Sequence, residues 1–454
     1  MSRARRAAAL AAVLLGPGLA AADRDPWQAG TTPLTYGRPG GRVLVHYVTT
    51  TVDAALPTDA DASGVPDFVE EVALRGDQAL ARFVELGFRP PRTDGTLGGD
   101  DRLDIYLRNL NGADGSFTAD TCTQTPFTCA GHVTMENDFV GYSYPTTSIG
   151  VQVLTSHELF HAVQNAYDGD QPVAWMEGSA VWAEEVVFPA QDDFEHLVAA
   201  FLAKPFRPFE RDGAGFGDLY PYGAGLWPYF LEAKLGPGIV AATWAGCEDA
   251  GADPAFLDAL DVELAARGTT VEDAWIEFTR WNARTGRWAD GTGYPDAARL
   301  PLALREAAIT APGQATVITE GLSARYQPIT GLVETSRVTV TSMRPVALDV
   351  RATAGDPTIT RVGDDGVATS HTFDVVLDGA ATSAELEVIV SGATRGGIQQ
   401  EVTVAIAPYT PPDPPAEDAG CGCQSSPAGG GGLVVAAAVA ALLRRRRYGI
   451  KPAV

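Results

Sequence analysis

Lysine is nearly absent from this sequence, which has only Lys204, Lys234 and Lys451 among its 454 residues. Arginine therefore supplies most of the positive charge, and 57 acidic residues against 33 basic ones give a net charge of −24. A chain this acidic is repelled by nucleic-acid phosphates and by anionic membrane surfaces. The charge balance argues against nucleic acid as a partner and suits a soluble exported protein.

Cysteine is also scarce. Five cysteines in so long a chain rule out a disulfide-dense scaffold, and no set of them has the spacing of zinc ligands. Cys122 and Cys129 bracket a short Thr/Pro loop and are predicted to pair in an oxidising compartment. Cys247 is then unpaired and buried, whereas Cys421 and Cys423 belong to the C-terminal segment.

Long apolar runs are lacking as well. Near the N-terminus, three arginines precede the apolar stretch Ala7–Leu15, which is too short to span a bilayer. The small residues Ala20–Ala22 follow it and provide a cleavage site. This order predicts a secretory signal peptide over residues 1–22 and an exported mature protein.

The C-terminal segment has an equally distinct order. A proline-rich linker (410–420) precedes Cys421-Gly-Cys423, the apolar stretch Leu433–Leu443 and the cluster Arg444–Arg447. Residues 421–447 resemble C-terminal sorting signals of the myxosortase type (MYXO-CTERM). The resemblance implies a processing protease that acts at the GC motif and a secreted or cell-surface anchored protein, with membrane contact only through this signal. A simple tail anchor is the alternative, since the arginines follow the positive-inside rule.

The strongest chemical signal is His157-Glu158-Leu159-Phe160-His161, an HExxH motif in a stretch predicted to be helical over about Ser148–Ala166. Histidines four residues apart lie on the same face of a helix, where both imidazoles reach one ion. Glu158 then reaches the open side of the metal, where it takes a proton from water.

A hydrolytic zinc site takes three protein ligands and a water molecule. The metzincin pattern places its third histidine at position 167, after a glycine at 164, but the chain has Tyr167 and Gln164. A second predicted helix, Pro172–Val187, instead carries Glu177 within the sequence WMEGSAVW. The prediction is therefore one catalytic Zn²⁺ held by His157, His161 and Glu177.

The motifs HELFH and WMEGSAVW together resemble the HExxH and W-x-x-E-G-x-A motifs of gluzincin zinc peptidases. The resemblance implies hydrolysis of a peptide or protein substrate, with Glu158 as general base. From the layout LYPYGAGLW (219–227), it also implies that Tyr220 donates a hydrogen bond to the oxyanion, with Tyr222 in reserve. Glu184, two turns beyond Glu177, either orients a ligand histidine or lies at the surface.

Two other functions compete with an endopeptidase. Met135-Glu136-Asn137 is similar to the G-x-M-E-N motif with which aminopeptidases hold a free amine, but Val133 replaces its glycine. A strand there, His132–Phe139, is also predicted to form a sheet edge that pairs with an extended substrate. The second rival is an inactive metal-binding surface or adhesion protein, although the presence of Glu158 argues against it.

A second ion site is predicted in the acidic stretch after the first strand. Its spacing fits an EF-hand-type Ca²⁺ loop, with a glycine at position 6 for the sharp turn and a glutamate at position 12. An acidic turn that caps a helix is the alternative. The predicted ligands are Asp59, Asp61, Ser63, Val65, Asp67 and Glu70.

The order of periodic segments predicts an α+β fold. Residues 23–310 mix strands and helices, which the resemblance assigns to a gluzincin-like catalytic domain. Residues 311–409 contain short β-rich segments between Gly/Asp turns, a pattern typical of an antiparallel β-sandwich.

Overall fold

The computed structural model describes residues 24, 27, 30–191, 193–211, 217–248, 255–363, 366–377 and 382–410. The described residues up to Thr410 group into one compact unit. The predicted signal peptide and the predicted sorting signal both lie outside the described residues. Among the described residues, no helix is long and apolar enough to cross a membrane.

A five-stranded sheet begins the fold, in the order β1-β2-β3-β5-β4. The strands β2, β3 and β5 run parallel, whereas β1 and β4 are antiparallel to their neighbours. The strand with Glu136 is thus internal, and β4 forms the edge that we had predicted at His132–Phe139. We did not predict β4 because its sequence GSFTADTC has few apolar residues. The bounds are β1 Leu34–Tyr36, β2 Val43–Tyr47, β3 Leu103–Arg108, β4 Gly115–Cys122 and β5 Cys129–Glu136.

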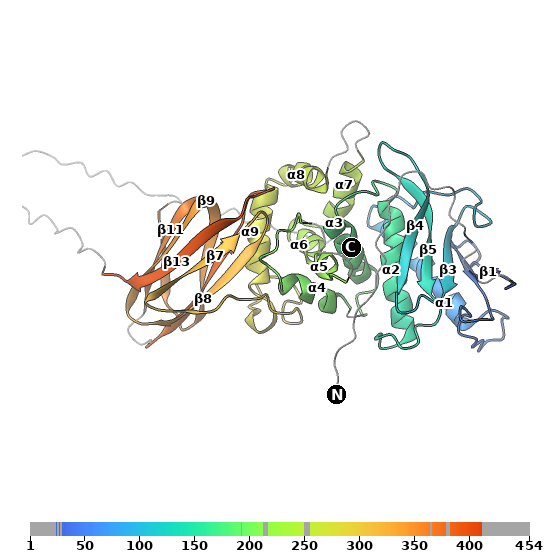
Figure 1. Cartoon of the computed structure of the whole chain (residues 1–454), viewed down its shortest axis with the longest axis horizontal. Coiled ribbons are helices and arrows are strands. Elements are labelled where there is room, and N and C mark those ends of the chain that lie inside the picture. The colour runs from blue at the N-terminus through green and yellow to red at the C-terminus, as the bar shows by residue number, and fades with distance from the viewer. Residues whose placement is uncertain are drawn as a thin grey trace, which may run out of the picture. The chain divides into compact units, whose positions relative to one another are not determined.

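Two helices, α1 (Asp67–Glu85) and α2 (Thr147–Gln164), cover one face of this sheet. Alternate strand residues such as Val45, Ile105 and Val133 are fully buried in the core beneath them, as expected from the two-residue period of a strand. Figure 1 shows α2 between this sheet and the remaining helices. Because α2 is covered on all sides, its residues from Gly150 onward are almost all buried.

The other face of the sheet carries a buried polar cluster. The guanidinium of Arg24 contacts three carboxylates, at 2.6 Å from Asp104, 2.5 Å from Asp94 and closely against Asp120. His46 and His132 pair with Asp104 and Asp120 at 2.7 and 3.0 Å. The side chains of the three aspartates are at most 3% exposed. Arg24 therefore balances charge that the sheet itself buries.

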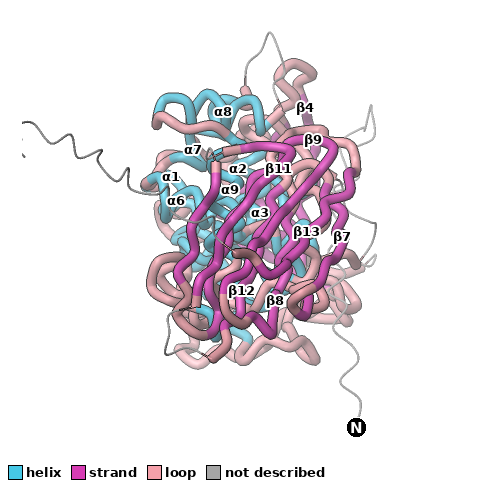
Figure 2. Tube along the Cα trace, turned by 90° about the vertical axis from the view of Figure 1, so that its left-hand side faces the viewer, coloured by secondary structure: helices cyan, strands magenta, loops and turns pink. Residues whose placement is uncertain are grey.

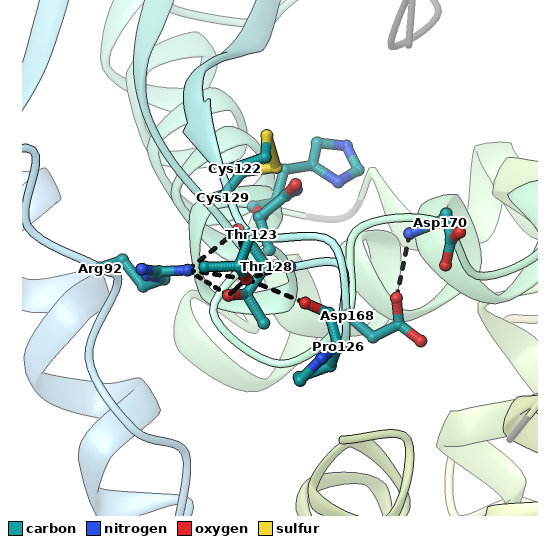
Figure 3. The surroundings of a disulfide bond; sticks show 10 residues. Arg92, Cys122, Thr123, Pro126, Thr128, Cys129, Asp168 and Asp170 are labelled. Atoms are coloured by element: carbon teal, nitrogen blue, oxygen red, sulfur yellow. Dashed lines mark hydrogen bonds between the residues drawn. A yellow bond between two sulfur atoms is a disulfide. The ribbon is translucent and has the colours of Figure 1, made fainter. Parts of the chain in front are cut away.

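A disulfide joins Cys122 at the end of β4 to Cys129 at the start of β5. Figure 3 shows Arg92 reaching into the intervening loop, where it donates to the carbonyl of Thr128 at 2.9 Å. The amide of Cys129 donates to the carbonyl of Asn165, just after α2, at 2.8 Å. The loop thus fastens the edge hairpin to the end of α2. Cys247 is buried and is not part of a disulfide.

The remaining helices pack on the far side of α2, beginning with α3, which contacts α2 directly. Their shared core contains aromatic side chains such as Trp175, Trp227, Trp244 and Trp275, all at most 2% exposed. The helices are α3 Val173–Val187, α4 Phe194–Leu202, α5 Tyr220–Gly223, α6 Leu226–Leu235, α7 Ile239–Gly246, α8 Phe256–Ala266 and α9 Val271–Asn282.

A second sheet follows, in the order β10-β11-β9-β12-β8-β6, with β13 joining β9 and β7. β9 is long, at 20 residues, whereas the sequence pattern predicts only short β-rich segments in this region. Figure 2 shows these strands side by side. The described residues therefore form an α+β fold, as predicted. The second sheet is mixed rather than wholly antiparallel, because β6 pairs in parallel with β8. The strands are β6 Ile309–Thr310, β7 Gly313–Thr319, β8 Ala324–Leu332, β9 Thr335–Ala354, β10 Thr358–Val362, β11 Val367–Val376, β12 Ala384–Ser391 and β13 Gln400–Pro408.

Candidate metal centre

The HExxH residues, His157–His161, lie in the C-terminal half of α2. The helix begins where the side chain of Thr146 accepts a hydrogen bond from the amide of Ile149, a typical N-cap. His157 and His161 are 3% and 4% exposed, and their ring centroids are 4.8 Å apart. Both imidazoles therefore lie on the face of α2 that meets α3.

Glu177 on α3 completes the group. Its Oε2 lies 3.3 Å from Nε2 of His157 and 3.5 Å from Nε2 of His161. One ligand atom from each residue falls within 4.8 Å of the other two. Burial opposes ionisation of Glu177, but the charges and hydrogen bonds of the two histidines outweigh it and lower its pKa to about 2. The carboxylate is thus held in its charged form.

Each histidine has a second partner on its Nδ1 atom. Nδ1 of His157 lies 2.6 Å from Oε1 of Glu184, and Nδ1 of His161 lies 2.7 Å from Oε1 of Gln164. Glu184 is 1% exposed, which excludes the surface position that we considered for it. Burial raises the pKa of Glu184 to about 7. Because Glu184 and Gln164 hold the Nδ1 atoms of the two histidines, both Nε2 atoms are directed at Glu177.

Glu158 lies beside these residues but has a different environment. It is 1% exposed, and within the described part of the chain its Oε2 has no hydrogen-bond partner. Burial raises the pKa of this carboxyl. A Cβ at Gly115, at the start of β4, would lie 2.9 Å from Cγ of Glu158. Because residue 115 is a glycine and has no side chain, the edge strand β4 can pass directly over the carboxyl of Glu158.

The structure does not bring Tyr220 to this group. Its hydroxyl donates to the carbonyl of Arg207 at 3.0 Å, and its ring stacks on that of Phe201. The reserve residue Tyr222 is the one that faces the site: its ring stacks on His157 with centroids 6.0 Å apart, and its hydroxyl interacts electrostatically with the carboxyls of Glu177 and Glu158. Burial and the neighbouring carboxylates raise the pKa of Tyr222, so it stays a hydrogen-bond donor. Tyr220 and Tyr222 are two residues apart on the short helix α5, so their side chains point in nearly opposite directions.

Two glycines allow Tyr222 to approach Glu177. A Cβ at Gly178 would lie 2.9 Å from the carbonyl carbon of Ala224, and a Cβ at Gly225 would lie 2.9 Å from the carbonyl oxygen of Gly178. The backbones of α3 and of the α5–α6 junction therefore touch. The glycine of the WMEGSAVW motif has this packing function.

A cavity of about 730 Å³ lies near the group, although its lining does not include the three candidate ligands or Glu158. Asp114 lines it and interacts electrostatically with both His157 and Glu158. Asp138 and Asp193 also line it, and no lysine or arginine is among its described lining residues. Glu136 lies there too, but its Oε2 accepts hydrogen bonds from the amide of Leu110 and the hydroxyl of Tyr142. The cavity therefore offers negative potential next to the candidate metal centre.

The acidic loop before α1 brings together Asp59, Asp61 and Asp67, with one carboxylate oxygen of each within 4.8 Å of the others. Asp59 accepts hydrogen bonds from the amides of Ser63 and Gly64, and Gly64 has a φ of 87°. Glu70 is in the first turn of α1 and is not among these grouped carboxylates. The loop thus has the predicted turn but not the full predicted ligand set.

The buried donor set fits a divalent cation. Two imidazoles and one carboxylate are ligands that Zn²⁺ prefers. The buried carboxyl of Glu158 interacts electrostatically with all three of these residues. Glu158, Glu177 and Glu184 also place three carboxyl groups beside two imidazoles in a buried region, where a bound cation would stabilise their ionised forms. No protein-family model and no curated protein matches this chain. Function is therefore inferred from the geometry of the site.

Sequence reasoning missed Gln164, Asp114 and Gly115. Gln164 was considered only as the residue that breaks the metzincin pattern, although its position three residues after His161 places it on the same helix face. Asp114 and Gly115 belong to the start of β4, a strand without an apolar pattern, and nothing in their local sequence points to the site.

Proposed function

We propose that this chain is an exported zinc metallopeptidase with a gluzincin-like site that hydrolyses internal peptide bonds. The observation that carries the proposal is the convergence of His157, His161 and Glu177 beside the buried, unpartnered carboxyl of Glu158. These three residues would hold the ion. When bound, Zn²⁺ supplies Lewis acidity and lowers the pKa of a water molecule.

Each of the other residues of the site has a separate role in the proposed reaction. Glu158 accepts a proton from the attacking water and passes it to the leaving amine, which its lack of a competing hydrogen bond at Oε2 supports. The hydroxyl of Tyr222 donates a hydrogen bond to the developing oxyanion. Glu184 and Gln164 hold the two imidazoles in position through their Nδ1 atoms.

Substrate is proposed to bind along β4. As an edge strand, β4 offers backbone groups that pair with an extended peptide, and its first residue, Gly115, lies against Glu158. The carboxylate of Glu136 already serves Leu110 and Tyr142, which favours an endopeptidase over an aminopeptidase that uses it to hold a free amine. The acidic cavity favours peptides with basic side chains.

Metal content and hydrolysis together test this proposal. The purified mature chain is expected to contain one zinc per molecule by elemental analysis and to cleave casein. A chelator is expected to abolish cleavage, and added Zn²⁺ to restore it. Two versions of one peptide, with a free and with an acetylated N-terminus, distinguish the two peptidase types. An endopeptidase is expected to cleave both equally, whereas an aminopeptidase requires the free N-terminus. Lack of zinc contradicts the proposal, and zinc without hydrolysis supports an inactive metal-binding surface protein.

The two tyrosines of α5 provide a matched pair of variants. Tyr222→Phe is expected to lower kcat by about 10²-fold, because it removes one oxyanion donor. Tyr220→Phe removes a hydroxyl that donates to the carbonyl of Arg207, so kcat should stay within about threefold of the wild-type value, with a stability loss of about 1 kcal/mol. Steady-state kinetics on one peptide compares them. The reverse ranking would restore Tyr220 as the donor.

We also propose that the acidic loop binds Ca²⁺ as a structural ion. Millimolar Ca²⁺ is then expected to raise Tm by about 2–4 °C, as measured by calorimetry. Asp59→Asn keeps an oxygen for the amides of Ser63 and Gly64 but removes a charge, and it should lose this shift. Asp101→Asn, an exposed control outside the loop, should keep it. A wild-type Tm that does not respond to Ca²⁺ contradicts the site.

The second sheet is proposed to be a β-sandwich that binds substrate or spaces the peptidase from a cell surface. The branching at β9 supports this arrangement. Its N-terminal half pairs with β13 and its C-terminal half with β12, and apolar side chains from both halves share one core. Surface display itself rests on the resemblance of residues 421–447 to sorting signals.

A further inference from the structure

The side-chain amide of Gln164 connects the two helices that carry the candidate ligands. Gln164 is the last residue of α2 and is completely buried. Its Oε1 lies 2.7 Å from Nδ1 of His161. Its Nε2 donates to the carbonyl of Met176 at 2.8 Å and to Oγ of Ser179 at 3.0 Å. Met176 and Ser179 lie on either side of Glu177 in α3.

The hydrogen-bond directions determine which way this amide points. The hydroxyl of Ser179 donates its single hydrogen to the carbonyl of Trp175 at 2.6 Å. Its oxygen is therefore an acceptor for Gln164, and the carbonyl of Met176 also accepts only. Both of these partners require the NH₂ group of Gln164 on the α3 side. The amide oxygen must then face His161.

A carbonyl oxygen cannot donate, so Nδ1 of His161 carries the hydrogen in this contact. Nε2 is then the nitrogen with a lone pair, and it is the atom directed at Glu177. His157 is oriented differently, by the carboxylate of Glu184. A neutral amide at His161 avoids adding a further buried negative charge to a site that already contains Glu158, Glu177 and Glu184.

We infer that Gln164 is a positioning residue: it holds His161 in the tautomer that ligates through Nε2 and sets the register of α3, so that Glu177 meets the two histidines. This inference rests on the proposed zinc site. It assigns the relay Trp175–Ser179–Gln164–His161 a role in metal affinity rather than in stability alone.

Zinc affinity of the full-length mature protein tests the inference. Competition with a chromophoric chelator measures Kd for wild type, Gln164→Met and Gln171→Met. Gln164→Met preserves size but removes the acceptor and both donors, so Kd should rise by about 10–100-fold, the usual effect of losing such a partner. Gln171 is also buried and hydrogen-bonded, to Asp168 and Phe256. Gln171→Met should leave Kd within about threefold of the wild-type value.

Nitrogen-15 NMR of the imidazoles in the zinc-loaded wild type supplies a measurement that needs no variant. His161 is expected to show a protonated Nδ1 and a metal-bound Nε2. The opposite assignment, or an unchanged Kd in folded Gln164→Met, would overturn the role of Gln164. A wild-type protein that binds no zinc would instead overturn the proposed function itself, so the two failures are distinguishable.

Discussion

Glu158→Gln is expected to lower kcat for peptide hydrolysis by about 10²–10⁴-fold, the range for loss of general acid–base catalysis. The substitution keeps the size of the side chain but replaces a proton acceptor with an amide. Because Glu158 is not one of the three grouped ligand residues, zinc should remain bound at one ion per chain. Kinetics on a single peptide and elemental analysis of the same sample measure both quantities.

A matched control is available on the neighbouring helix. Glu185 is partly exposed at the end of α3, and Glu185→Gln makes the same chemical change outside the site. Its kcat should equal that of the wild type. Wild-type rates in zinc-loaded Glu158→Gln would show that another group accepts the proton. Asp114 and Glu184, which interact electrostatically with Glu158, are the alternative acceptors.

Arg24→Met is expected to reduce the free energy of unfolding by about 3–5 kcal/mol, since it leaves buried carboxylates without their shared cation. The Arg24 side chain is 9% exposed and contacts Asp94, Asp104 and Asp120. Methionine retains the aliphatic volume, so the loss reports on charge rather than on packing. Urea denaturation followed by tryptophan fluorescence measures it.

An exposed arginine gives the comparison. Arg38 pairs with Asp77, but its side chain is 41% exposed, and Arg38→Met should cost less than about 1 kcal/mol. Equal losses for the two variants would contradict the role of Arg24. Cleavage after residue 22, as the sequence predicts, would make Arg24 the second residue of the mature chain. The stability of the first sheet would then depend on an intact mature N-terminus.

The helices of the site could be predicted closely from the sequence. Structure places α2 at Thr147–Gln164 and α3 at Val173–Val187, against predictions of Ser148–Ala166 and Pro172–Val187. Both segments are apolar over most of their length and end near polar or proline residues, which are strong local signals. The residues that touch across these helices were also predictable in part, because the spacing of HExxH determines a helix face.

Contacts between distant segments were not predictable in this way. The spacing predicts Tyr220 as the donor, with Tyr222 in reserve, but Tyr222 is the tyrosine that stacks on His157. The close packing of Gly178 against Gly225 brings its segment to the site. β4 was missed because an edge strand with polar residues is stabilised by hydrogen bonds to its neighbour rather than by apolar burial. Glu70 has the spacing of a calcium ligand, yet the grouped carboxylates are those of the loop itself and of Asp67.

The sequence by itself determined the chemistry that this protein has at hand: two histidines and a glutamate on one helix, a second glutamate on the next, and an α+β order of elements. These follow from local spacing, because a helix repeats every 3.6 residues wherever it lies. Tertiary structure decided which partners orient those groups. Gln164, Glu184, Tyr222 and Gly115 reach the site from other turns, helices and strands. Their distances depend on how whole elements pack, and no local pattern records that packing.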